Sequence, residues 1–205
     1  ISLVIAVPLG IFAAIFLVEY ASRGNKLLGL IRLTTETLSG IPSIVYGLFG
    51  LLFFVDTLGW GFSMIAGAFT LAIMILPLII RTTEEALKSV PNSFREGSFG
   101  LGAGKLRTVF KIVLPSAVPG ILAGIILAVG RIVGETAALM YTAGTAANVP
   151  SSIMGSGRTL AVHMYTLASE GLYMNQAYAT AVVILVMTVG INTLSSVVAR
   201  RLVKN

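Results

Sequence analysis

Long uninterrupted runs of apolar residues constrain the fold of this chain more than any other feature. Each run is about 17 to 25 residues long, the length at which a helix crosses about 30 Å of hydrocarbon. Because the runs are continuous and do not alternate with polar residues, helices are expected rather than the strands of a barrel. They lie at about 1–19, 41–57, 62–81, 116–139 and 176–199. The sequence therefore predicts an all-α, polytopic membrane protein with about five spans.

The composition favours a single membrane domain over residues 1–205. Of the 205 residues, 56% are hydrophobic and 11% are charged, whereas soluble proteins carry about 25% charged residues. There are no cysteines, so neither disulfides nor thiolate metal sites are expected. The chain starts at Ile1 within apolar sequence and without a basic leader. This predicts an N-terminally truncated fragment of a longer protein.

The basic residues predict how the spans are oriented. All Lys and Arg residues except Arg131 and Arg158 fall in segments 20–40 and 81–115 and in the C-terminal tail. Five spans place these three segments on one side, and positively charged segments face the cytoplasm. We therefore expect them to be cytoplasmic and a loop at about 140–175 to be external. The net charge of +6 reflects this topology and not a nucleic-acid partner, which would require a concentrated basic face with stacking aromatics.

A polar, glycine-rich stretch at about 84–115 separates the third run from the fourth. Pro91-Asn92-Ser93 is a helix start signal, and the glycines at 102 and 104 permit a sharp turn. Two short helices are therefore expected, at 92–101 and 105–113.

Neither a nucleotide site nor a metal site is expected in this chain. The glycines before Lys105 do not form a phosphate-binding P-loop, because that motif needs glycine at Phe99 and a hydroxyl at Leu106. His163 is the single histidine, and it has no Cys, Asp or Glu at ligand spacing. We expect no cofactor to be bound by the chain itself.

The fourth run contains two ionisable residues, Arg131 and Glu135. A charge at membrane depth costs about 2.5 to 3.5 kcal/mol on insertion scales and about 10 to 17 kcal/mol in simulations, so it marks a functional hypothesis. Spaced at i and i+4 on one helix, the two side chains can form an ion pair. Four glycines are expected on the same helix face, in two G-x-x-x-G spacings typical of close packing: Gly120, Gly124, Gly130 and Gly134. The pair either neutralises itself inside a bundle or offers its guanidinium to an oxyanion.

The spacing of small and apolar residues within 84–115 resembles the cytoplasmic EAA loop of ABC-importer permeases. In that loop, E-A-A is followed by three residues, a glycine, nine residues and I-x-L-P. The matching residues are Glu96, Gly102, Ile112, Leu114 and Pro115, and Gly97 and Ser98 replace the two alanines. The resemblance implies that Glu96 and its neighbours enter a cleft on a cytoplasmic ATPase dimer. We expect Gly97, Ser98 and Gly102 to form a small-residue face toward that partner; an ordinary solvated loop is the alternative.

Residues 130–137 read GRIVGETA, which is similar to the G-R-x-x-G-E-T-A signature of phosphate-specific (Pst) ABC-importer permeases. Stretches 19–21, 40–48 and 81–87 also resemble that family, so the likeness extends over nearly the whole chain. The A-type subunit fits better than the C-type, although Ala138 stands where A-type sequences usually have proline.

The resemblance implies a MetI-like permease core in a bacterial or archaeal inner membrane, with phosphate passing Arg131, Glu135 and Thr136. It also implies four partners: a second homologous permease, the ATPase dimer, an external phosphate-binding protein and inorganic phosphate. Our hypothesis is that phosphate displaces Glu135 from Arg131 and that Glu135 reclaims Arg131 afterwards.

Three other functions remain as alternatives. A permease for sulfate, molybdate or phosphonate would share the cytoplasmic loop. An intramembrane enzyme would need a nucleophile, a metal cluster or a carboxylate pair at membrane depth, where Glu135 stands alone. A passive channel would not need a docking loop. The chain is therefore expected to be a transporter subunit and not an enzyme.

Overall fold

The computed structural model describes residues 1–21 and 26–204, and every regular element among them is a helix. Ten of these elements are α-helices, and three short π-helical segments continue α1, α3 and α6. The elements are α1 (Ser2–Ile15), η1 (Phe16–Tyr20), α2 (Lys26–Ser39), α3 (Ser43–Gly50), η2 (Leu51–Thr57), α4 (Met64–Ser89), α5 (Asn92–Gly100), α6 (Lys105–Thr108), η3 (Val109–Val113), α7 (Leu114–Val133), α8 (Ala137–Met140), α9 (Leu160–Glu170) and α10 (Met174–Lys204).

Four of the helical rods are long and apolar enough to cross a membrane: Ser2–Tyr20, Met64–Ser89, Lys105–Val133 and Met174–Val197. A bent pair of helices brings the number of candidate spans to as many as five. This confirms the all-α architecture with several spans. Two boundaries differ from the prediction, because α4 continues to Ser89 and the fourth span ends at Val133.

The second span differs most from the prediction. Segment 20–40 is not a simple loop, because Lys26–Ser39 form α2; α2 meets the helix Ser43–Thr57 at an angle of 99°. The predicted span at 41–57 is therefore one arm of a bent pair. Pro42 stands at the bend, where it cannot donate a backbone hydrogen bond and disfavours helix in the residue before it.

Two side-chain interactions hold α2 in place. Arg32 forms an ion pair with Glu84 of α4 at 2.8 Å, and Lys88 pairs with the same carboxylate at 2.7 Å. Across the bend, the Tyr46 hydroxyl donates to the Leu38 carbonyl at 2.7 Å. The charge on Arg32 thus joins α2 to α4.

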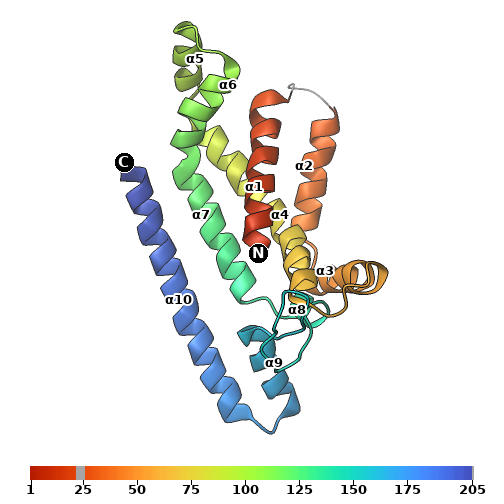
Figure 1. Cartoon of the computed structure of the whole chain (residues 1–205). Coiled ribbons are helices and arrows are strands. Elements are labelled where there is room, and N and C mark those ends of the chain that lie inside the picture. Colours follow the sequence, from red (N-terminus) through yellow and green to blue (C-terminus); the bar gives the residue numbers. More distant parts are fainter. Residues whose placement is uncertain (22–25, 205) are drawn as a thin grey trace.

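The helices pack around α4. It contacts α1, α2, α3, α7 and α8, and 56% of the residues in its apolar window are buried, against none in that of α10. Figure 1 shows α5 and α6 at one end of the molecule, and α3, α8 and α9 toward the other. The C-terminal end of α10 lies in the half that contains α5 and α6. This arrangement agrees with basic segments gathered toward one side.

One of the two predicted G-x-x-x-G spacings is a packed interface. A Cβ atom at Gly120 would lie 2.7 Å from the Cβ of Ala86, and one at Gly124 would overlap Thr82, so α7 approaches α4 closely at both glycines. Gly130 and Gly134 have no such close neighbour among the described residues.

The segment predicted as an external loop at 140–175 is largely structured. Three backbone N–H groups at the start of α4 donate to this segment: Ser63 to Thr142, Met64 to Gly155 and Ile65 to Ile153, each at 3.0 Å. Beyond them lies α9, which the sequence analysis missed. Its signals were present: Thr159 caps its first turn and Gly171 ends it with φ +71°.

We predict that Gly47→Ala destabilises the protein. A Cβ atom there would lie 2.9 Å from the Ala138 Cα and 3.1 Å from the Ala137 carbonyl oxygen. Backbone atoms cannot yield as a flexible side chain can, so a cost of about 1 to 3 kcal/mol is expected. Thermal unfolding of the detergent-purified protein measures it. Gly190→Ala is the matched control, because no atom lies within 4 Å of a Cβ there; equal melting temperatures would contradict the close contact.

Candidate functional site

The stretch at 84–115 begins in the last turns of α4 and then folds into two short helical segments, α5 and α6–η3. Their bounds, Asn92–Gly100 and Lys105–Val113, confirm the two predicted helices. Gly102 turns the chain between them with φ +81°, a conformation that favours glycine. We call residues 92–113 the coupling unit. It runs without a break into α7, so Pro115 lies inside a continuous helical rod and not at the start of a span.

The predicted small-residue face of the coupling unit is only partly present. Glu96, Gly97 and Gly102 are exposed, but Ser98 is buried. The Ser98 and Thr108 hydroxyls share a hydrogen bond of 2.8 Å. The small side chain at 98 therefore lets α5 pack onto α6, and the expectation that it faces a partner was wrong.

Large apolar side chains are exposed on the coupling unit instead. The exposed fraction is 91% for Leu101, and the others of this kind are Phe94, Phe99, Leu106 and Phe110. Of the remaining residues matched to the EAA pattern, Ile112 and Leu114 are half-buried and Pro115 is exposed. Sequence reasoning did not single out the exposed set, although its signal was present as large apolar residues within an otherwise polar stretch.

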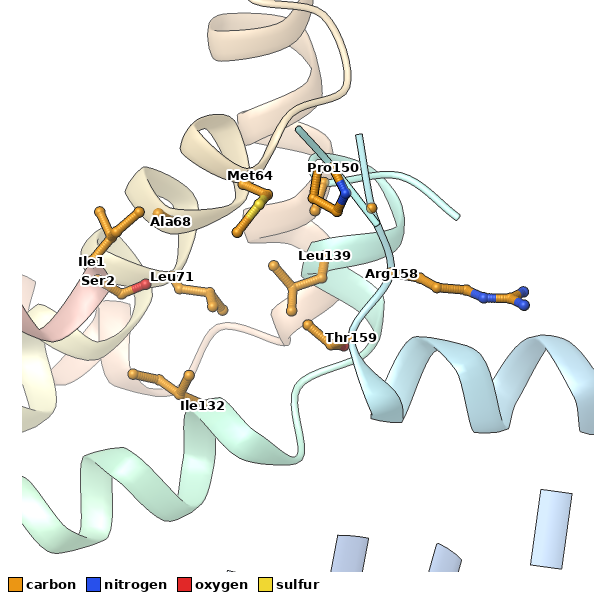
Figure 2. A pocket seen from close by; sticks show the side chains of 12 residues that line it. Ile1, Ser2, Met64, Ala68, Leu71, Ile132, Leu139, Pro150, Arg158 and Thr159 are labelled. Carbon is orange, nitrogen blue, oxygen red and sulfur yellow. The ribbon is translucent and has the colours of Figure 1, made fainter. Parts of the chain in front are cut away.

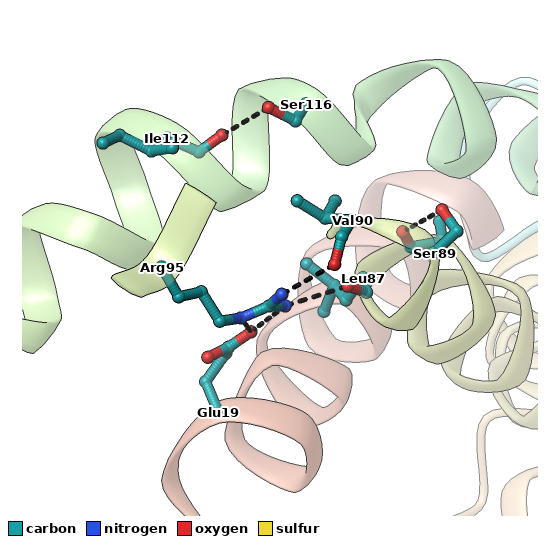
Figure 3. A network of polar contacts seen from close by, with 8 residues as sticks. Glu19, Leu87, Ser89, Val90, Arg95, Ile112 and Ser116 are labelled. Atoms are coloured by element: carbon teal, nitrogen blue, oxygen red, sulfur yellow. Dashed lines mark hydrogen bonds and ion pairs between the residues drawn. The ribbon is translucent and has the colours of Figure 1, made fainter. Parts of the chain in front are cut away.

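Arg95 anchors the coupling unit to the rest of the protein (Figure 3). Its Nη2 and Nε atoms donate to the Glu19 carboxylate at 2.7 and 3.1 Å. The same guanidinium donates to the carbonyls of Leu87 and Val90 at 3.0 and 2.8 Å, at the end of α4. Both charged side chains are mostly buried, with exposed fractions of 15% for Arg95 and 9% for Glu19. One arginine thus joins α5, η1 and α4.

A second contact joins η1 to the other half of the coupling unit. The Lys105 ammonium lies 5.1 Å from the centroid of the Tyr20 ring, within range of a cation–π interaction. Adjacent residues at the end of the first span therefore contact both α5 and α6. The one sequence signal for this role of Glu19 is its place in the family-like stretch 19–21.

The predicted ion pair between Arg131 and Glu135 is absent from the described structure. The reason is that α7 ends at Val133, so the two residues do not share one helix face. The Glu135 carboxylate instead accepts a hydrogen bond of 3.1 Å from the Ala138 N–H, at the start of α8. A carboxylate is stabilised at that end of a helix. Thr136, the residue before α8, donates to the Gly134 carbonyl at 3.4 Å.

Arg131 lies in the last turn of α7 and lines a cavity of about 550 Å³ between α4, α7 and α10. Within residues 1–21 and 26–204 it forms no ion pair. Its charge is therefore available to an anion. In the same described part of the chain, no group of three or more His, Asp or Glu residues is arranged to hold a metal ion.

The next residue, Ile132, lines a different cavity, of about 340 Å³, at the opposite end from the coupling unit (Figure 2). Its wall is mostly apolar, with Met64, Leu71 and Leu139 among the lining side chains. The Arg158 side chain extends away from the other labelled residues. The last turn of α7 thus lies between two cavities, a mostly apolar one that Arg158 also lines and the one that Arg131 lines.

A family model described as "Binding-protein-dependent transport system inner membrane component" matches residues 6–205. The chain belongs to this family. It is therefore a multi-pass inner-membrane protein of a family of transport-system components. The family membership and the named relatives confirm the resemblance that the cytoplasmic loop and residues 130–137 indicated.

Two curated relatives are similar over most of the chain. The probable ABC transporter permease protein YqgI of Bacillus subtilis (strain 168) is 41% identical over 185 residues, which are 84% of this chain and 63% of the relative. The phosphate transport system permease protein PstA of Mycobacterium leprae (strain TN) is 35% identical over 195 residues, 92% of this chain and 62% of that protein. The chain spans about three fifths of the length of these relatives.

A solved structure shares the fold. An inward-facing crystal form of the MetNI methionine ABC transporter aligns with a TM-score of 0.75 and 20% identity, covering 98% of this chain and 87% of the other. The MetI-like permease architecture predicted from the sequence is therefore confirmed.

We predict that Arg95→Gln loosens the coupling unit without unfolding the spans. Breaking a buried ion pair from one side costs about 3 kcal/mol, which corresponds to roughly 100-fold faster amide exchange through local opening. Hydrogen exchange measured by mass spectrometry over residues 92–113 tests this. The control is Arg81→Gln, which breaks a pair with Glu85 whose side chains are 58% and 64% exposed and should change exchange little. Equal protection in the two variants would contradict the anchoring role.

Proposed function

We propose that this chain is a permease subunit of an ATP-driven importer of inorganic phosphate. The observation that carries the proposal is the Arg131 guanidinium, which forms no ion pair within the described part of the chain and lines a cavity between the spans of a permease fold. A cation held at that depth is costly unless an anion meets it, and a guanidinium fork suits a tetrahedral oxyanion. Relatives named as phosphate transport permeases support phosphate as that anion.

The same proposal assigns ATPase docking to the coupling unit. Exposed Glu96 lies among exposed apolar side chains such as Leu101, and an apolar surface with a few charges is typical of a protein interface. ATP is then bound by a partner ATPase dimer. A second homologous permease completes the pathway, and an external phosphate-binding protein delivers the substrate. The coupling unit and the tail are cytoplasmic on this reading.

Coupling follows from the contacts of Arg95. A displacement of α5 by the ATPase pulls on Glu19 at the end of the first span and on the Leu87 and Val90 carbonyls at the end of α4. An equilibrium between two states shifts only if a partner contacts them differently. We infer that the ATPase contacts the coupling unit differently before and after ATP hydrolysis, and that α4 and η1 follow.

Within the pathway, Arg131 binds the anion and Glu135 competes for Arg131. The two side chains are apart in this structure, with Glu135 on the Ala138 N–H. In our proposal this is the state in which Arg131 is open to phosphate. When the segment after Val133 rearranges, Glu135 and Thr136 approach Arg131 and the anion is released.

Another oxyanion importer, for sulfate, molybdate or phosphonate, is the second candidate, since the guanidinium alone would accept any of these anions. The likeness of residues 130–137 to the Pst signature favours phosphate. Of the two permease types in that family, the A-type is favoured by the names of several relatives.

We predict that Leu101→Glu abolishes ATPase docking. The side chain is 91% exposed, so its replacement should leave stability within about 0.5 kcal/mol. A charge inside an apolar interface should weaken ATPase binding at least about tenfold. Copurification of the ATPase with the permease measures the loss. Val149→Glu is the control, because Val149 is 94% exposed but lies far from the coupling unit; equal copurification would contradict the docking surface.

We predict that Arg131→Gln lowers phosphate uptake by about two orders of magnitude, because a charge-assisted contact to a buried anion contributes about 3 kcal/mol. Uptake of radiolabelled phosphate is measured in cells or vesicles with matched amounts of permease in the membrane. Arg81→Gln removes the same charge at an exposed site and should transport normally. Undiminished uptake by Arg131→Gln would refute the substrate role.

A further inference from the structure

The helix that follows the bend at Pro42 runs across the molecule and not along it. We call the segment Ser43–Thr57, which consists of α3 and η2, the transverse helix. It meets α2 at 99°, and Figure 1 shows it projecting to one side of the other helices. Its two parts have 8 and 7 residues, so it is about 22 Å long. A bilayer contains about 30 Å of hydrocarbon, so both direction and length argue against a crossing.

The transverse helix packs near the end of α4 that is farther from the coupling unit. A Cβ atom at Gly50, midway along it, would overlap the Thr70 hydroxyl of α4. Helix α4 is mostly apolar from Met64 to Ile80 and carries Arg81 next, so this stretch of about 25 Å fills most of the hydrocarbon layer. Thr70 lies six residues after Met64, about 9 Å along the helix. One leaflet contains about 15 Å of hydrocarbon, so the transverse helix lies at the depth of the leaflet farther from the coupling unit.

Aromatic side chains gather where the transverse helix ends. Trp60 stacks on Phe54 with ring centroids 5.4 Å apart, and it packs edge-on against Phe69 of α4 at 5.5 Å. Tryptophan is enriched at the level of the lipid headgroups. Asp56, in the last turn, is exposed, and a carboxylate is costly at the bilayer centre but not where it reaches water. Both features indicate a shallow depth.

The two faces of the transverse helix differ in the size of their side chains. Gly47 and Gly50 face the protein, and a Cβ atom at Gly47 would lie 2.9 Å from the Ala138 Cα. Helices in membranes associate through such small residues, and the glycines of this segment are already used against α8 and α4. The opposite face exposes large apolar side chains: Ile44, Val45, Leu48, Phe49, Leu52 and Phe53. This face therefore has the composition of a surface that meets acyl chains and not another helix.

We propose that the transverse helix lies in the plane of the membrane, with its exposed face on the acyl chains of the leaflet farther from the coupling unit. The exposed apolar surface continues through Leu58 and Phe62 to Met64 at the start of α4, so it joins the surface of a membrane span. Interfacial helices usually have a polar face toward water. The transverse helix needs none, because its other face packs against protein. This holds whichever anion the protein transports.

Spin labels on the transporter, reconstituted in vesicles of phosphatidylethanolamine and phosphatidylglycerol, test the proposal. The chain has no cysteine, so one introduced cysteine carries the label, and the subunits that copurify with the chain are used in cysteine-free form. Collisions of the label with oxygen, which enters the acyl region, and with a water-soluble nickel chelate report its depth. Val45→Cys and Leu52→Cys lie on one helix face, at positions 46% and 63% exposed. Both labels should collide mainly with oxygen and lie at nearly the same depth.

Val182→Cys and Val189→Cys are the matched control on α10. They have the same spacing along the chain, at positions 60% and 57% exposed. Because α10 is a candidate span, their depths should differ by about 10 Å. If a label at 45 or 52 prevents assembly, Ile44→Cys and Leu48→Cys replace that pair, and their depths should again be nearly equal.

Three results would overturn the proposal. Depths at 45 and 52 that differ by about 10 Å would show that the segment crosses the membrane. Labels that collide with neither reagent would show that a protein partner covers the face, and labels that collide mainly with nickel would show that it faces water. None of these results would affect phosphate transport, which is tested separately at Arg131.

Discussion

Close packing against α4 holds this molecule together. In a membrane, burying apolar surface between helices gains little, because lipid tails are as apolar as the side chains, so helices associate through close contact and polar bonds. Gly120 and Gly124 let α7 approach α4, and Gly47 lets α3 approach α8. Helix α4 also forms polar contacts. Its Glu84 binds Arg32 of α2, and the carbonyls at its C-terminal end accept hydrogen bonds from Arg95.

The charged residues near the coupling unit join helices, whereas we propose that Arg131 binds the anion. Glu19 and Glu84 each hold a cation from another element, and both carboxylates are mostly buried. Removing one partner leaves the other charge buried and unpaired, which makes such pairs sensitive to mutation. Arg131 has no carboxylate partner in the described chain. This difference separates a candidate ligand-binding residue from charged residues that join helices.

The predictable features of this protein are those that depend on local sequence. Continuous apolar runs gave the all-α spans, and Gly102 gave the turn between two short helices. The second span was misjudged because α2 is amphipathic and mostly exposed: a cross-helix ion pair between Arg32 and Glu84 ties it to α4, and no local pattern reveals that pair. The pairing of Arg131 with Glu135 failed for a related reason, since it assumed that α7 continues beyond Val133. The Glu19–Arg95 contact forms only in the tertiary fold, so sequence spacing carried no information about it.

The continuity of the rod Lys105–Val133 bears on the order of events during transport. At about 1.5 Å per residue, 29 residues span roughly 43 Å, from the turn at Gly102 to the turn that carries Arg131. No loop interrupts this helix, so the proposed ATPase-docking surface and the guanidinium proposed to bind the anion lie near its two ends. Under the proposed function, a displacement at one end moves the other directly, and the nucleotide cycle then times access to the anion site without a separate gate.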